Sequence, residues 1–188
     1  MMMLTMTHLG TIRLETSRLI LRKFEEADTE TAFHVWTSDP KVTKYLRWEH
    51  HRNISQMQAL GQSWLMKYND PQWYHWVIVP KEVGFPIGTI SAANIYNETD
   101  TVEIGFCIGS EYWGLGYITE AFAAVIEFFF EEVHAKRIEA KYAPENKASG
   151  RVMEKCGLTF EGTLRSSDRI HSGITDVNVC SLLAKDYF

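Results

Sequence analysis

The clearest pattern of hydrophobic and polar positions lies between residues 102 and 133. From Val102 to Gly109, apolar residues alternate with small or charged ones, which predicts a strand with one apolar face. From Tyr117 onward, apolar residues recur every three or four positions, which predicts a helix over 117–133. A turn that contains Gly114 and Gly116 joins the two. The segment is therefore predicted to run from strand through glycine turn to helix.

Such a turn has an electrostatic consequence. The first N–H groups of a helix have no partner within the helix, and the helix dipole adds positive charge at the same end. Exposed N–H groups and positive potential together attract anions, phosphate above all. The turn around Gly114 and Gly116 is thus a candidate phosphate-binding site.

Similar patterns predict the other elements of the chain. Strands are expected over 11–23, 73–79, 87–95, 137–142, 159–164 and 176–184, and helices over 25–36, 55–68 and 146–156. Short turns join the three strands between 73 and 109, which predicts an antiparallel meander. The expected fold class is α/β (α+β), with a mixed, mostly antiparallel sheet of about seven strands and about four helices. Residues 1–10 are expected to form a flexible extension and residues 11–188 one domain.

Composition and charge exclude a few classes of protein but do not identify a function. A chain of 188 residues with a net charge of −5 suits one globular domain and argues against nucleic acid as the main partner. No apolar run reaches the ~20 residues that span a membrane, and Met1–Met6 lacks the features of a secretory signal. Cys107, Cys156 and Cys180 form no CxxC pair, so we expect reduced thiols in a cytoplasmic protein. The histidines show no ligand spacing, and we expect no metal.

Five stretches, taken in order, extend over nearly the whole chain. They are Thr16–Arg22 (TSRLILR), Glu103–Phe106 (EIGF), Tyr112–Ala121 (YWGLGYITEA), Pro144–Ser149 (PENKAS) and Glu154–Leu158 (EKCGL). Each alone is a weak signal, but the ordered set resembles the GNAT superfamily of acetyl-CoA-dependent N-acetyltransferases. Within it, the chain resembles the ribosomal-protein-alanine N-acetyltransferase (RimJ/RimL-like) branch. The resemblance implies a single-domain GNAT-like fold, with a sheet that splays at its centre and acetyl-CoA as co-substrate.

The resemblance also implies which residues hold coenzyme A. Backbone groups of the turn would bind the diphosphate, with a contribution from each of Trp113, Gly114, Leu115, Gly116, Tyr117, Ile118 and Thr119. Trp113 departs from the broad family pattern, although not from this branch, and Ile118 is bulkier than the usual residue. The pantetheine arm would pair with the backbone of Phe106, Cys107 and Ile108 like an added strand and would contact Asn146 and Ser149.

Two residues are candidates for the chemistry of acetyl transfer. Glu103 matches a position where some family members place a base, and the amine must lose its proton before it attacks. The alternative is a Glu103 that forms an ion pair or is solvated. Ser149 is the candidate acid for the coenzyme A sulfur, because Met153 stands where many members have a tyrosine. Its hydroxyl could instead bond a helix carbonyl, and Asn146 could simply cap the helix.

The favoured hypothesis is an acyltransferase that moves an acetyl group to a primary amine by direct attack on the thioester. A protein N-terminal α-amine, as in ribosomal proteins, is the expected acceptor. The alternatives are a small-molecule amine or a non-catalytic acetyl-CoA-binding regulatory module; a dinucleotide site is disfavoured because Thr119 replaces the third glycine. We expect a monomer or homodimer with no nucleic acid or membrane partner. Expected walls of the acceptor pocket are Trp36, Trp48, Tyr96 and the loop 166–173.

Overall fold

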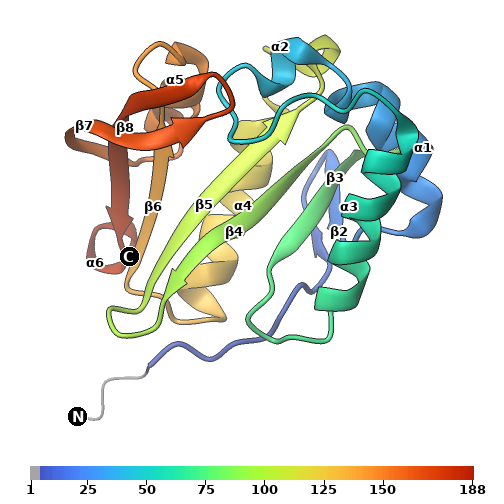
Figure 1. Ribbon diagram of the computed structural model, residues 1–188. Helices are drawn as coiled ribbons and strands as arrows, with labels where there is room; N and C mark the ends of the chain where they lie inside the picture. The colour runs from blue at the N-terminus through green and yellow to red at the C-terminus, as the bar shows by residue number, and fades with distance from the viewer. Residues whose placement is uncertain (1–4) are drawn as a thin grey trace.

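The computed structural model describes residues 5–188, so residues 1–4 of the expected extension lie outside the described part. Its strands are β1 (Leu14–Glu15), β2 (Leu19–Arg22), β3 (His75–Pro80), β4 (Gly88–Tyr96), β5 (Thr101–Ile108), β6 (Arg137–Tyr142), β7 (Thr159–Ile170) and β8 (Gly173–Leu183). They form one eight-stranded sheet in the order β1-β2-β3-β4-β5-β6-β8-β7 (Figure 1). Only the β5–β6 pair is parallel among the described strand pairs. The expected antiparallel meander of β3, β4 and β5 is confirmed.

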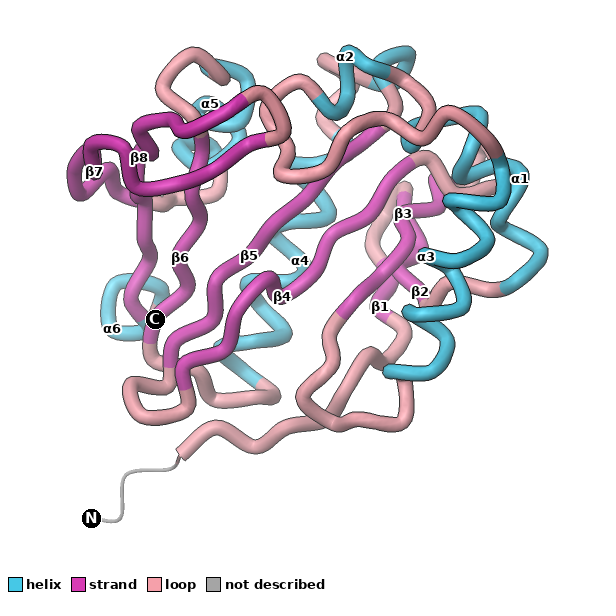
Figure 2. Tube along the Cα trace, viewed as in Figure 1, coloured by secondary structure: helices cyan, strands magenta, loops and turns pink. Residues whose placement is uncertain are grey.

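Helices lie on both sides of this sheet (Figure 2). They are α1 (Thr29–Ala32), α2 (Pro40–Thr43), α3 (Ile54–Lys67), α4 (Tyr117–Glu131), α5 (Lys147–Lys155) and α6 (Ala184–Tyr187). Shorter turns of 3-10 helix cover Glu26–Asp28 and Ser110–Tyr112, and a π-helical turn covers Phe33–Thr37. None of the described helices combines the length and the apolar character needed to cross a bilayer.

Two hydrophobic cores hold the layers together, one on each face of the sheet. On one face, the apolar stripe of α4 packs against β5, with the Phe106 and Phe122 rings 5.7 Å apart. On the other face, Trp36 and Met57 of the early helical region are fully buried against Val77 and Val79 of β3. Alternate residues of the strands face these two cores, as a two-residue period requires.

The sheet opens at its centre, between β5 and β6. The two strands pair in register from Thr101↔Arg137 to Ile104↔Ala140, and the pairing stops there. β5 continues to Ile108, whereas β6 turns toward β8 and keeps pairing with it as far as Tyr142↔Asn178. The splayed centre implied by the family resemblance is therefore present.

Several expected elements differ from those observed. The strand predicted over 11–23 is two antiparallel strands, because the chain turns at Thr16, whose N–H donates to the Leu19 carbonyl. The helix predicted over 25–36 is broken into 3-10, α and π turns of three to five residues each, and segments this short do not show which helical period they follow. The expected loop 166–173 is mostly strand, because β7 and β8 form a long hairpin. The residues that extend the two expected strands, 165–175, are mostly exposed and polar, and they lack the alternation that predicts a strand.

The described residues before β1 contact the rest of the molecule. The N–H group of Met6 donates to Asp100 Oδ1 (3.2 Å), and that of Thr7 donates to the Val133 carbonyl (2.9 Å). The N–H group of Leu9 donates to the Tyr74 hydroxyl (3.1 Å). Residues 6–9 thus run along the body of the domain.

Candidate active site

The opening between β5 and β6 leads into a cleft of about 840 Å³. Its floor is β5 from Ile104 to Ile108, and its end is the turn from Tyr112 to Thr119. One wall is built by residues 141–155, which include α5, and the facing wall by residues 41–46 in and after α2. In Figure 1, α5 and α2 both lie at the upper edge of the molecule, above the sheet and near the end of β5.

The glycine turn presents backbone donors at one end of this cleft. Gly114 and Gly116 have φ values of 78° and 82°, a left-handed conformation that glycine adopts without a steric penalty. Gly116 is the N-cap of α4 and supplies no side-chain cap, so the N–H groups of the first helical turn keep no helical partner. The turn and the start of α4 line the cleft through Trp113, Gly114, Gly116, Tyr117, Ile118 and Thr119. Leu115 does not line it.

The bulky Ile118 does not obstruct this end of the cleft. Its side chain is 7% exposed and belongs to the core between α4 and the sheet. Trp113 is half exposed, and its indole N–H donates to the Ile108 carbonyl (3.0 Å). The cleft therefore still reaches the start of α4, whereas the Trp113 backbone N–H already donates to the Ser110 carbonyl (3.4 Å).

The edge of β5 offers a second set of backbone groups. The Gly109 N–H donates to the carbonyl of Ile87, directly before β4. In an antiparallel pair, successive residues direct their backbone N–H and C=O groups alternately toward the partner strand and away from it. Phe106 and Ile108 therefore direct their backbone groups away from β4, into the gap where pairing with β6 has ended. Cys107 directs its backbone toward β4, and burial raises the pKa of its thiol.

α5 brings two of the predicted residues to the cleft wall. Asn146 Oδ1 accepts the N–H of Ser149 (3.3 Å), so the predicted capping role of Asn146 is present. The Ser149 hydroxyl lines the cleft and has no hydrogen bond to another described residue, including the helix carbonyls. Met153, at the position of the family tyrosine, is 1% exposed and packs in the core.

Glu103 is buried behind the wall of the cleft and does not line it. Its carboxylate accepts hydrogen bonds from Asn94 Nδ2 (2.9 Å) and Tyr96 Oη (3.2 Å). Lys141 Nζ pairs with it at 2.8 Å and reaches Glu139 at 3.1 Å. Burial alone would lower the pKa of Lys141, but these carboxylates outweigh it and raise the pKa, so the lysine is a cation. Lys141, and not Glu103, lines the cleft.

The charge of the cleft is opposite to that of the whole chain. Its lining contains six cationic side chains and one carboxylate, namely Lys41, Lys44, Lys141, Lys147, Arg151 and Lys155 against Glu145. The chain as a whole carries a net charge of −5. A concave surface that concentrates positive charge favours an anionic ligand.

Some lining residues were not predicted, and some predicted ones lie elsewhere. Lys141 and Tyr142 line the cleft at the end of β6, directly before the recognised stretch at 144–149, and that position was the available signal. Trp36 is 1% exposed in the second core and does not line the cleft. Trp48 and Tyr96 do not line it either; Tyr96 instead contacts Glu103.

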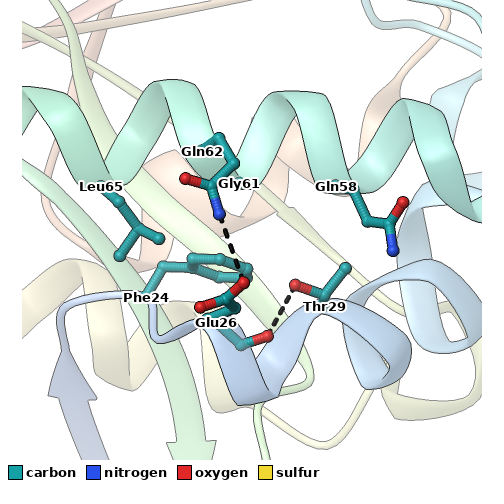
Figure 3. A pocket seen from close by; sticks show the side chains of 7 residues that line it. All are labelled: Phe24, Glu26, Thr29, Gln58, Gly61, Gln62 and Leu65. Carbon is teal, nitrogen blue, oxygen red and sulfur yellow. Dashed lines mark hydrogen bonds between the residues drawn. The ribbon is translucent and has the colours of Figure 1, made fainter.

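A smaller hollow of about 320 Å³ lies beneath α3 and is shown in Figure 3. Glu26 is its only ionisable lining residue, and this side chain accepts a long hydrogen bond from Gln62 (3.5 Å). A single carboxylate beside amides and apolar groups assembles no catalytic set. No group of three or more potential metal ligands occurs within residues 5–188.

Comparison with known proteins agrees with the geometry. Residues 18–159 match the family model of the acetyltransferase (GNAT) domain. The N-acetyltransferase p20 of Bacillus licheniformis is 34% identical over 174 residues, covering 93% of this chain and 97% of its own. The ribosomal protein uS5-alanine N-acetyltransferase of Escherichia coli is 28% identical over 158 residues, covering 80% of each.

A solved structure supports the fold independently. The microcin C7 self-immunity acetyltransferase MccE, determined with acetyl-CoA and AMP, superposes with a TM-score of 0.81 at 22% identity. The match covers 89% of this chain and 93% of that one. The chain therefore belongs to the GNAT family of acetyltransferases and is an acetyl-CoA-dependent N-acetyltransferase.

Proposed function

We propose that acetyl-CoA binds along the cleft, with its diphosphate on the backbone N–H groups of residues 113–119. Support comes from the uncapped start of α4 and from the excess of cationic side chains around it. The pantetheine arm would follow the free edge of β5 at Phe106 and Ile108, opposite Asn146. Bound in this way, the thioester would lie near Ser149 on the facing wall.

The proposed reaction is a direct transfer. The neutral amine attacks the thioester carbonyl, a C–N bond forms, and the C–S bond breaks. A β5 backbone N–H stabilises the oxyanion that develops, and the Ser149 hydroxyl donates a proton to the departing thiolate. The proton that the amine gives up passes through water to Glu103, since this carboxylate lies behind the cleft wall.

The acceptor that this site suits best is a protein N-terminal α-amine. The observation that carries this proposal is the ion pair that holds Glu103, the candidate base, on Lys141; the carboxylate that lines the cleft, Glu145, is exposed to solvent. An α-amine, with a pKa of about 7.7–8, is partly neutral near pH 7.5, whereas a lysine at about 10.4 is almost fully charged. A site with a weak base therefore favours the α-amine. The relative that acts on the alanine of ribosomal protein uS5 supports the same acceptor class.

A matched panel of acceptors tests this proposal. One peptide carries a free N-terminal alanine and no lysine, a second carries the same sequence with an acetylated N-terminus and one internal lysine, and a polyamine represents small acceptors. Release of free thiol from acetyl-CoA is measured at pH 7.5. We expect kcat/KM to be at least about tenfold higher for the free N-terminus. A preference for the internal lysine or the polyamine would contradict the acceptor assignment.

A further inference from the structure

The turn between β1 and β2 is hydrogen-bonded to the start of α4, through the carboxylate of Glu120 on that helix. Glu120, in the first turns of α4, accepts hydrogen bonds from Thr16 Oγ1 (2.5 Å) and Ser17 Oγ (3.2 Å). It also accepts from the Arg18 backbone N–H (3.0 Å) and from Arg18 Nε (2.6 Å). Two segments that lie about a hundred residues apart in the chain are joined here by four hydrogen bonds.

Arg18 also contacts the glycine turn that precedes α4. Its Nη1 donates to the Leu115 carbonyl (3.1 Å), and its guanidinium lies 4.9 Å from the centre of the Tyr117 ring. A Cβ atom on Gly116 would lie 3.4 Å from Arg18 Nη2, so the side chain follows the backbone of the turn closely. Neither Arg18 nor Glu120 lines the cleft. Both side chains therefore contact the turn or the start of α4 without lining the cleft.

A second hairpin turn holds the same segment. Tyr117, the first residue of α4, is 3% exposed, and its hydroxyl donates to Glu82 in the turn between β3 and β4. The glycine turn and the first residue of α4 are thus fastened at Leu115 and Tyr117 by two hairpin turns. Without such contacts, a turn with two left-handed glycines would be free to adopt many conformations, and binding would have to restrict it.

We propose that Arg18 and Glu120 are positioning residues for coenzyme A: they fix residues 113–116 so that the backbone N–H groups point at the diphosphate. This inference rests on the proposed function, which places the diphosphate at that turn. Arg18 has a side chain 47% exposed, and an exposed ion pair adds little to stability. Its loss should therefore appear in cofactor binding more than in folding.

The test compares two acetyl donors that differ in the nucleotide and its phosphates, the diphosphate included. Acetyl-CoA and acetyl-pantetheine share the thioester and the pantetheine arm, and only the first carries phosphates. For Arg18→Ala and Glu120→Gln we expect KM for acetyl-CoA to rise about tenfold, with kcat within about twofold. KM for acetyl-pantetheine should not change. Arg18→Lys keeps a positive charge beside Glu120 but loses the planar guanidinium. Its KM for acetyl-CoA should lie between those of Arg18→Ala and the parent protein.

The matched control is Arg13→Ala. Arg13 belongs to the same region, pairs with the exposed Glu15 at 3.1 Å, and has no hydrogen bond to the described residues of the glycine turn. It should leave both KM values unchanged, and thermal melting should show that every variant is folded. An equal rise in KM for both donors, or no rise for acetyl-CoA, would overturn the inference. A parent enzyme that does not prefer acetyl-CoA over acetyl-pantetheine would contradict the proposed diphosphate site itself.

Discussion

At the scale of single residues, Ser149, the proposed acid, lines the cleft. Its hydroxyl is exposed to the cleft and has no hydrogen-bond partner among the described residues, so it is available to a ligand. Glu103 differs, because three polar side chains already bind its carboxylate. Sequence alone placed both residues as candidates and could not separate them. Lys141, which forms the ion pair with Glu103, lies 38 residues away in the chain.

We predict that Ser149→Ala lowers kcat by on the order of a hundredfold, because the thiolate would leave without a proton. The affinity for coenzyme A should stay nearly unchanged, since the backbone donors of the turn remain. Steady-state kinetics and a binding titration measure the two effects separately. Ser55→Ala, on the exposed side of α3, serves as the control. Full activity of Ser149→Ala would remove this hydroxyl from the mechanism.

At the scale of elements, the cleft exists because neighbouring segments end or turn at different points. β5 continues beyond the last residue that pairs with β6. α4 begins after a glycine, which has no side chain to cap the helix. The strand, the turn and the helix were predictable, because their hydrophobic periods are strong and two glycines mark the turn. α2 was not predictable, because a helix of four residues is too short for a period. It nevertheless stands at one wall of the cleft.

The contact between the β1–β2 turn and α4 should also make stability depend on pH. Burial would raise the pKa of Glu120, but the hydrogen bonds from Thr16 and Arg18 outweigh it and lower the pKa to about 2, from an ordinary 4.5. A depressed folded-state pKa stabilises the protein above pH 4.5, and this contribution is lost as pH falls toward 2.

Denaturant unfolding at pH 5.5 and pH 3 measures this contribution. The free energy of unfolding should fall by on the order of 1 kcal/mol more in the parent protein than in Glu120→Gln, after allowing for solvent screening around Arg18. The variant has no carboxylate to protonate at this site. Equal losses in the two proteins would show that the Glu120 contact is not the source.

At the scale of the whole molecule, the sequence predicted the fold more fully than the site. Strong periods and ordered motifs specified one α/β domain, the central strand and the glycine turn before α4. The cationic cleft was only partly visible. Lys147, Arg151 and Lys155 form a basic stripe at helical spacing on α5, but a net charge of −5 averages over the surface and gives no sign that six cations gather at one opening. Lys41 and Lys44 reach that opening from a segment that carries no recognised motif. Tertiary proximity of this kind is not encoded in any local pattern.

The central claim is that the turn at residues 113–119 binds the diphosphate of coenzyme A. Isothermal titration calorimetry of the parent protein with coenzyme A and with pantetheine tests it most directly, because the two ligands share everything but the nucleotide and its phosphates. We predict that coenzyme A binds at least about a hundredfold more tightly, through charge-assisted hydrogen bonds to the turn. Equal affinities for the two ligands, or no heat with coenzyme A, would contradict the claim.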